Sequence, residues 1–429
     1  MFAFSPFFPE NTQTNLFLHR FLGYDTGIGG AVSALPSFRR DFGISPSNAP
    51  STISNIVSIL FGGAWFGALI FALLSHYIGR RKGLMVATVI FTVGAITQTA
   101  CKGNLGQMYA GRFITGLGIG AVAEISPTFT AECSSPKWRG RAVAMVEMNL
   151  VAGGLLSYWI TYATSLHIPP SSSSQWRIPI AIQLIFGGIA FFCTLPMNES
   201  PRWLISKGKD SAGLASLAYL RCTNLDDPAL LNEFAEIKAQ VKEEIEVAKG
   251  VTFRELMLPY NRKRLFISTF LGLWGIWTAH TALVVYAPTI FQQIGFSQAT
   301  TSLLASGVFA TLKFVVTIIA IALTVDRFGR VVSMCVGLIS TGTIFFSLAA
   351  IQATHPPRAE GNISAASKAM MALIYLHVII YSFTMGPMPW IYSSEIFPLR
   401  LREIGQMAFS VGTCESLRFR FHLLNSYRS

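Results

Sequence analysis

The stretch Val325-Asp326-Arg327-Phe328-Gly329-Arg330 separates two long apolar runs of the chain. A similar basic pattern, Gly79-Arg80-Arg81-Lys82, follows an earlier apolar run, and others stand at Arg139-Gly140-Arg141 and Leu399-Arg400-Leu401-Arg402. Each pattern places guanidinium groups where a membrane-spanning helix is expected to leave the bilayer. The recurrence predicts that the two halves of the chain repeat one helical plan.

The composition excludes an ordinary soluble protein. Hydrophobic residues make up 52% of the chain and charged residues only 13%, whereas soluble domains carry about 25% charged residues. Runs of roughly 20 apolar residues can cross a hydrocarbon core about 30 Å thick. Such runs lie near residues 52–75, 84–101, 107–129, 142–164, 178–196, 266–290, 302–324, 332–352 and 369–391, with a weaker one near 16–35. The sequence therefore predicts an all-α polytopic membrane protein with about ten transmembrane helices.

The net charge of +12 is distributed unevenly along the chain. Lys and Arg gather in alternate loops, notably at residues 80–82, 137–141, 202–264, 327–330 and 400–402. Under the positive-inside rule these loops are cytoplasmic, so the N-terminus is expected inside. We interpret the positive balance as a topology signal, and not as a nucleic-acid surface.

Four ionisable residues in the predicted spans are candidates for function: Asp25, Arg112, Glu124 and Lys313. An ionisable side chain at membrane depth is costly, so Arg112 needs an acidic partner such as Asp25. If the first run is a loop, Asp25 is merely solvated. Glu124 either lines a cavity or pairs with a neighbour, and Lys313 either reaches a cavity or an acid, or packs between helices.

Glycine and proline mark places where helices pack closely or break. The first run is glycine-rich around Gly23 and Gly27, and we expect a broken or closely packed helix there. Gly116 and Gly120 give the fourth span a small-residue face. The Pro387–Pro389 stretch is expected to unwind the tenth span, giving a flexible point where one bundle gates against the other.

No pattern in the sequence indicates an enzyme. It contains no recognisable nucleophile with its base, metal cluster or phosphate-binding loop, and the six cysteines show no paired spacing. We therefore expect no cofactor, no disulfide framework and no zinc site. Asn362-Ile363-Ser364 is a glycosylation sequon in a predicted outer loop, and it is either used or a chance match.

Motifs spread over nearly the whole chain resemble those of one known family. The first is a long signature of fixed spacing that runs through Ile114, Gly116, Gly120, Phe129, Glu132 and Arg139. The others are Gly23-Tyr24-Asp25-Thr26-Gly27, Glu199-Ser200-Pro201-Arg202-Trp203-Leu204, Asp326-Arg327-Phe328-Gly329-Arg330, and Gly386-Pro387-Met388-Pro389-Trp390 followed by Glu395-Ile396-Phe397-Pro398. In these motifs the chain resembles the sugar porter family of the major facilitator superfamily. Within that family it is most similar in kind to the fungal hexose, polyol and quinate transporters.

The resemblance implies a major facilitator fold of two pseudo-symmetric helical bundles, with a solute cavity between them and alternating access by rocking. The bundles would comprise residues 1–196 and 265–429, joined by a cytoplasmic linker of short amphipathic helices at 197–264. The resemblance also implies a cytoplasmic clasp of charged side chains. Carried over residue by residue, the clasp consists of Arg80, Arg81, Glu132, Arg139, Glu199, Arg202, Asp326, Arg327, Arg330, Glu395 and Arg402. Alternatively, these charges only fix the topology.

Family members that are driven by protons resemble this chain in having an aspartate at the place of Asp25 and an arginine at that of Arg112. A carboxylate beside an arginine stays ionised, and it takes up a proton when that contact breaks. The resemblance therefore implies carbohydrate–proton symport, with Asp25 and Arg112 as the coupling pair.

Departures from the family pattern concern mainly the solute contacts. A glutamine of helix five falls on Glu147, and the glutamine pair and asparagine of helix seven fall on Gly275, Ile276 and Thr281, while His76 and Val331 replace loop residues. The candidate solute contacts are Glu147, Trp277, His280, Thr281, Lys313 and Trp390. Either the solute is not glucose but a pentose, polyol, disaccharide or sugar acid, or it binds through the aromatic, histidine and threonine side chains of this set. Lys313 and His280 would suit an acidic solute, which Glu147 would oppose.

The apolar pattern ends soon after Cys414, so helices 11 and 12 are expected to be missing from a C-terminally truncated product. Two alternatives to transport are therefore a non-transporting nutrient sensor of the same fold and an inactive truncated product. The expected partners are a sugar or related polyhydroxy solute, protons and membrane lipid, with no nucleic acid. We expect a monomer in the plasma membrane.

Overall fold

The structure is a computed structural model. It describes residues 10–45, 47–135, 139–248, 258–278, 280–296, 298–324, 329–355, 364–386, 388–389, 392 and 396. All regular elements within these ranges are helices. In chain order they are α1 (Glu10–Ser33), α2 (Pro36–Asp41), α3 (Ala49–Ile78), α4 (Arg80–Thr99), α5 (Leu105–Cys133), α6 (Arg139–His167), α7 (Ser174–Thr194), α8 (Pro201–Ser206), α9 (Asp210–Arg221), α10 (Pro228–Ala248), α12 (Pro259–Trp277), α13 (His280–Val285), α14 (Ala287–Gln293), α15 (Ala299–Thr324), α16 (Arg330–Thr354) and α17 (Ala365–Thr384).

The lengths and apolar surfaces of these helices suit a lipid bilayer. Within the described residues, 7 helical stretches are long and apolar enough to cross a membrane, and α1, α5 and α6 are of comparable length. Large apolar side chains lie exposed on the outside, including Phe192 at 69%, Ile339 at 71% and Phe346 at 81%. Such a surface is stable against lipid tails and unfavourable in water. The prediction of an all-α membrane protein is therefore confirmed.

Local sequence signals set several helix ends. The side chain of Asn104 accepts a hydrogen bond from the backbone N–H of Gly106 at 2.8 Å, and that of Ser364 accepts one from Ser367 at 3.0 Å. These caps satisfy N–H groups that have no partner within their own helices, α5 and α17. Gly79 joins α3 to α4 with a φ of 97°, a backbone conformation that residues with a Cβ rarely adopt.

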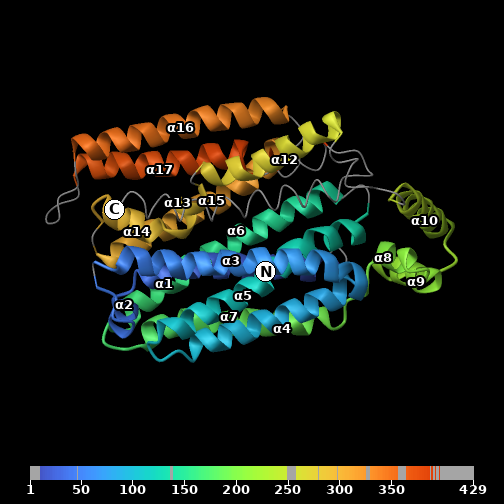
Figure 1. Cartoon of the computed structure of the whole chain (residues 1–429), viewed down its shortest axis with the longest axis horizontal. Coiled ribbons are helices and arrows are strands. Elements are labelled where there is room, and N and C mark those ends of the chain that lie inside the picture. Colours follow the sequence, from blue (N-terminus) through green and yellow to red (C-terminus); the bar gives the residue numbers. More distant parts are fainter. Residues whose placement is uncertain are drawn as a thin grey trace.

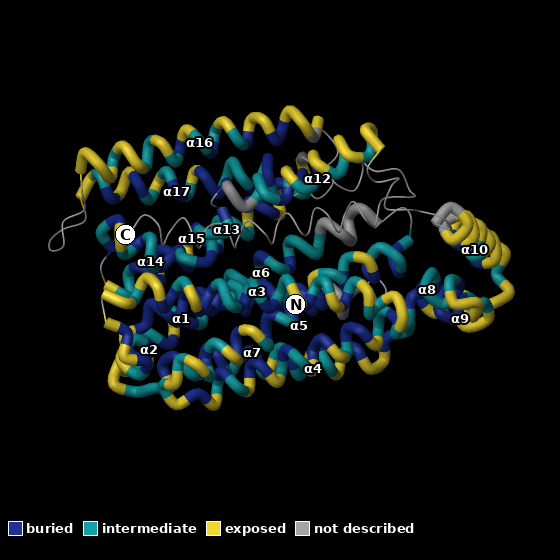
Figure 2. The backbone as a smooth tube through the Cα atoms, in the orientation of Figure 1, coloured by how far each residue is buried: buried dark blue, intermediate teal, exposed yellow. Residues whose placement is uncertain are grey.

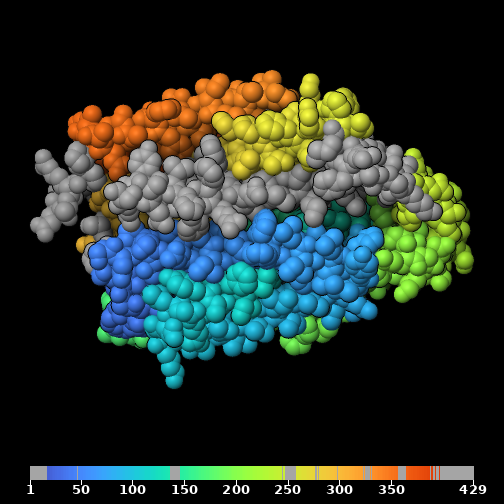
Figure 3. Space-filling model, in the orientation of Figure 1, coloured from blue at the N-terminus to red at the C-terminus, as the bar shows by residue number. Residues whose placement is uncertain are grey.

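The helices form two sets. We call α1–α7 the first helical set and α12–α17 the second, and α8, α9 and α10 lie between them in the sequence. Figure 1 shows α1–α7 on one side, α12, α16 and α17 on the other, and α8–α10 together at one end. Exposed residues follow the outward sides of α16, α4 and α7 (Figure 2), and on the face drawn in Figure 3 the first set occupies one side of the molecule and α12 and α16 the other. The basic loops predict that the end with α8–α10 is cytoplasmic. We call it the cytoplasmic end, and the end with α2 and α14 the outer end.

Close packing in the first set depends on small residues. A Cβ on Gly120 of α5 would lie 1.9 Å from the carbonyl oxygen of Ala64 in α3, and one on Gly116 would lie 2.2 Å from that of Leu60. The two backbones therefore approach so closely that only glycine fits, as the sequence predicted. In the same way, a Cβ on Gly23 of α1 would lie 1.8 Å from the carbonyl oxygen of Leu150 in α6.

Glycine and proline have different effects in three of the spans. The helix α1 continues without interruption through Gly23 and Gly27, because these glycines serve its approach to α6. The seventh span breaks between α13 and α14, and Pro288 stands in the first turn of α14. The helix α17 ends at Thr384, before the proline pair, and Pro387 and Trp390 lie outside the described residues.

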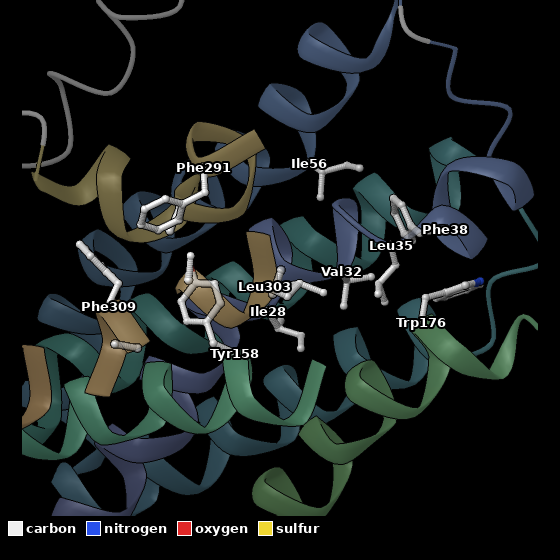
Figure 4. Packing of buried hydrophobic residues seen from close by; sticks show 14 of the residues in the cluster. Ile28, Val32, Leu35, Phe38, Ile56, Tyr158, Trp176, Phe291, Leu303 and Phe309 are labelled. Atoms are coloured by element: carbon white, nitrogen blue, oxygen red, sulfur yellow. The ribbon is translucent and has the colours of Figure 1, made fainter. Parts of the chain in front are cut away.

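At the outer end the two helical sets meet in an apolar cluster. Figure 4 shows Ile28 and Tyr158 of the first set beside Phe291, Leu303 and Phe309 of the second. The hydroxyl of Tyr158 donates a hydrogen bond to the carbonyl of Val284, and Arg39 Nη2 donates to Gln292 Oε1 at 3.2 Å. A Cβ on Gly30 would lie 1.7 Å from the carbonyl oxygen of Val285. The two sets are therefore in tight contact at this end.

The close crossing of α3 and α5 yields a stability prediction. Gly120→Ala should lower the free energy of unfolding by about 1–3 kcal/mol, because the two backbones must separate to admit the methyl group. Gly62→Ala is the matched control, since nothing lies within 4 Å of the Cβ it would add to α3. Thermal unfolding of the purified protein in detergent compares the two, and equal midpoints would contradict this account of the crossing.

Candidate functional site

A buried carboxylate with two side-chain partners lies in the first helical set. Asp25 of α1 has no exposed surface, and Arg112 of α5 is 2% exposed. Arg112 Nη1 lies 3.4 Å from Asp25 Oδ1, and Gln183 Nε2 of α7 donates a hydrogen bond to the same oxygen at 2.5 Å. The structure thus brings together Asp25 and Arg112, as the sequence predicted, and adds Gln183. We call these three residues the Asp25 cluster.

Only one oxygen of the Asp25 carboxylate is engaged by these donors. Asp25 Oδ2 has no hydrogen-bond partner in the described part of the chain, and neither has Arg112 Nε. An ionised carboxylate at this depth requires the nearby guanidinium, since an unpaired charge in hydrocarbon is costly. A neutral carboxylic acid would need no such counter-charge, and its proton could reside on Oδ2. The geometry therefore allows two charge states of one cluster.

A small cavity lies between the two helical sets. Its volume is about 30 Å³, and its lining residues are Glu147, Lys313, Thr317, Ile321, Tyr381, Ser382 and Gly386. Glu147 and Lys313 come from α6 and α15, which pack together, and the two charged groups interact electrostatically. A volume of this size admits water but no sugar, since ligand pockets measure roughly 300–1,000 Å³. The described conformation is therefore closed around this site.

The other predicted solute contacts take different positions. His280 begins α13, is 4% exposed, and stacks on Tyr381 with ring centroids 3.6 Å apart. Thr281 follows it on α13 and is partly buried. Trp277 ends α12, but its side chain lies outside the description, and Trp390 lies outside the described residues altogether. The structure thus brings Glu147 and Lys313 to one cavity and places His280 beside a residue that lines it.

A polar network joins α4, α5 and the segment before α8 at the cytoplasmic end. Arg80 Nη2 donates to Glu132 Oε1 at 3.0 Å, and Glu199 Oε1 accepts from the backbone N–H groups of Arg80 and Arg81 at 2.9 and 3.1 Å. Arg81 Nη2 also donates to the carbonyl oxygen of Leu195 at 2.5 Å. Glu199 therefore satisfies N–H groups of the first turn of α4, where a negative charge is favoured.

Burial raises the pKa of Glu199, and hydrogen bonds from the backbone N–H groups of Arg81, Ser200 and Arg80 oppose that shift. Arg202 Nη2 donates to Gln240 Oε1 at 2.9 Å. The other predicted members of the clasp are not placed in this network. Arg139 begins α6 and Arg330 begins α16, but the structure does not describe their side chains. Four further members lie outside the described residues: Asp326, Arg327, Glu395 and Arg402.

Gln183, His377 and Tyr381 were not predicted as site residues from the sequence. Gln183 and His377 are fully buried on α7 and α17, and Tyr381 lines the cavity. All three lie within predicted spans, where a polar side chain is costly unless it has a partner or a function. That signal was present, but the sequence alone does not show which helices face one another. Glu124, for which two roles were left open, is partly buried on α5.

A family model of sugar transporters and curated fungal permeases both match this chain. A family model described as "Sugar (and other) transporter" matches residues 13–415. The quinate permease of Neurospora africana is 33% identical over 401 residues, which cover 90% of this chain and 74% of that protein. A probable quinate permease of Aspergillus fumigatus is 33% identical over 400 residues, covering 90% of this chain and 73% of the relative.

Solved structures show the same fold. The proton:xylose symporter XylE bound to 6-bromo-6-deoxy-D-glucose matches with a TM-score of 0.78 and 22% identity, covering 97% of this chain and 89% of that one. A partially occluded inward-open conformation of XylE from E. coli also matches with a TM-score of 0.78, at 21% identity, with 95% and 89% covered.

The Glu199 contacts predict a selective effect on stability. Glu199→Ala should lower the free energy of unfolding by about 1–2 kcal/mol, because it leaves N–H groups of α4 without their acceptor. Glu199→Gln keeps an acceptor oxygen and has no charge to desolvate, so its unfolding midpoint in detergent should remain near that of the wild type. If the alanine variant unfolds at the wild-type temperature, Glu199 does not hold α4 in this way.

Proposed function

The chain belongs to the sugar transporter family, and on that premise we propose that it is a proton symporter for a polyhydroxylated solute. Its relatives are permeases, and its described helices suit an integral membrane protein. The observation that carries the proposal is the Asp25 cluster, a carboxylate held between Arg112 and Gln183 without exposed surface. A group of this kind is costly in a membrane and is the natural place for a transported proton.

Coupling follows from the two charge states of the cluster. While Arg112 lies beside it, Asp25 is favoured as a carboxylate. Movement of α1 relative to α5 separates the two groups, and a proton on Asp25 Oδ2 then replaces the lost counter-charge. Gln183 donates to Oδ1 in either state, so it keeps the side chain oriented while the charge changes. The proton and the conformational change are thereby linked.

Alternating access requires contacts at each end that open in turn. We assign the two moving bundles to residues 1–196 and 265–429, with residues 197–264 as the cytoplasmic linker. The apolar cluster around Tyr158 and Phe291 closes the outer end in the described conformation. The network of Arg80, Glu132 and Glu199 would strengthen the cytoplasmic end when that end closes in its turn. The plasma membrane is the proposed location.

The solute is, in this proposal, a cyclic polyhydroxy acid of the quinate class. Curated relatives that are about one-third identical to this chain are named quinate permeases. Lys313 places a cationic side chain at the cavity, and Gly275 and Thr281 stand where hexose carriers of the family have amide side chains. Glu147 balances Lys313 while the site is empty, and the carboxylate of the solute would compete for that cation when it enters.

Substitution of the coupling carboxylate provides the test of symport. Asp25→Asn should abolish accumulation of quinate above its outside concentration, because an amide takes up no proton, while exchange of labelled for unlabelled quinate persists. Asp210→Asn is the matched control, since Asp210 pairs with Lys238 outside the membrane-spanning helices. Uptake by a transporter-null yeast, with and without a protonophore, measures both variants, and accumulation by Asp25→Asn would overturn the mechanism.

Charge selectivity should depend on Lys313. Lys313→Gln is expected to raise the KM for quinate about tenfold, which corresponds to one lost charge-assisted hydrogen bond. The KM for quinate methyl ester, which lacks the negative charge, should change much less. Lys368→Gln serves as the control, because Lys368 is exposed on α17. Equal losses for acid and ester in the Lys313 variant would show that the cation does not recognise a carboxylate.

A further inference from the structure

Two buried histidines and a tyrosine form a ring column next to the cavity. His280 of α13 stacks on Tyr381 of α17 with ring centroids 3.6 Å apart and planes inclined by 7°. His377 lies one turn before Tyr381 on α17. Its ring centroid is 5.6 Å from that of His280 and 5.8 Å from that of Tyr381. The column therefore joins the seventh span to the tenth, within the second helical set.

The histidine nitrogens of this column lack partners. His280 is 4% exposed and His377 has no exposed surface, yet neither ring nitrogen of either residue has a hydrogen-bond partner in the described part of the chain. A neutral imidazole carries one donor and one acceptor, and burying both without partners costs free energy. Phenylalanine would fill the same space without that cost, and the immediate neighbour of His377 is itself apolar, since the ring centroid of Phe345 lies 5.2 Å from that of His377. Packing alone therefore does not explain the two imidazoles.

The column is adjacent to the charged residues of the cavity. Tyr381 belongs to both, since it stacks on His280 and lines the cavity with Ser382. Lys313 of α15 and Glu147 of α6 line the same cavity.

We propose that His280 and His377 bind the hydroxyl groups of the solute, with His377 as a specificity-determining residue, while Lys313 binds the carboxylate. A hydroxyl both donates and accepts a hydrogen bond, as a neutral imidazole does, so each can satisfy the other. The described residues contain no cluster of three metal-ligating side chains, so the pair alone makes no metal site. The inference rests on the proposed function, because it assigns contacts to the same solute: the histidines to its hydroxyl groups and Lys313 to its carboxylate.

The test compares two substitutions of His377. His377→Phe keeps an aromatic ring but removes both nitrogens, and it should raise the KM for quinate about tenfold with little change in maximal rate. His377→Asn retains a donor and an acceptor, and it should recover most of the lost affinity. Phe345→Leu alters the packing against His377 without removing a polar atom, and its KM should stay at the wild-type value. Transport in proteoliposomes gives KM and maximal rate for each variant.

Binding by the purified protein separates the two ways in which the idea could fail. The unfolding midpoint in detergent is measured with quinate and with cyclohexanecarboxylate, which keeps the charge but has no hydroxyl groups. Quinate should raise the unfolding midpoint of the wild type but not that of His377→Phe. Cyclohexanecarboxylate should shift the midpoints of the two proteins by the same amount. If quinate stabilises both variants equally, the role of His377 is wrong and the proposed function stands. If quinate neither stabilises nor is carried by the wild type, the proposed solute class is wrong, and this assignment fails with it.

Discussion

An ionised carboxylate inside a membrane protein must be held by other groups, and the first helical set is arranged around this constraint. Asp25 lies on α1, which packs against α5, α6 and α7 and also reaches α13 and α14. The glycines of α1 let it approach α6 closely, while α5 and α7 deliver Arg112 and Gln183 to the same oxygen. A displacement of α1 would therefore change the surroundings of the charge and the contact between the two sets together.

The contacts at the two ends of the molecule differ in chemistry. At the outer end the sets are joined by apolar side chains and by hydrogen bonds from Tyr158 and Arg39, whereas at the cytoplasmic end charged groups and helix termini of the first set meet. Apolar contacts are non-directional and can separate without stranding charges, while a charged network keeps a defined geometry. Between these ends lies a cavity of about 30 Å³ that must enlarge before a solute enters. Such an arrangement suits a carrier that opens one end at a time.

How far the sequence predicts the site depends on the kind of residue. Pairing of Asp25 with Arg112 could be foreseen, because each charge needs a partner at membrane depth. Gln183 and His377 could not be assigned, since a neutral polar residue in an apolar run does not reveal which helix it faces. The fold class followed from apolar runs and basic loops, but the continuity of α1 did not, because the same glycines would suit either a break or a close helix crossing. Much of the predicted clasp lies outside the described residues, so its role across the two bundles stays a prediction.

The central claim is that solute and proton move together through this protein. The most direct measurement is proton flux driven by solute alone, in proteoliposomes without a membrane potential or an imposed pH gradient. Adding quinate outside should make the external medium more alkaline and acidify the lumen, beyond the effect of the same addition to empty liposomes. Quinate entry without any accompanying proton flux would contradict the account, because the carrier would then be moving its solute uncoupled from the Asp25 cluster.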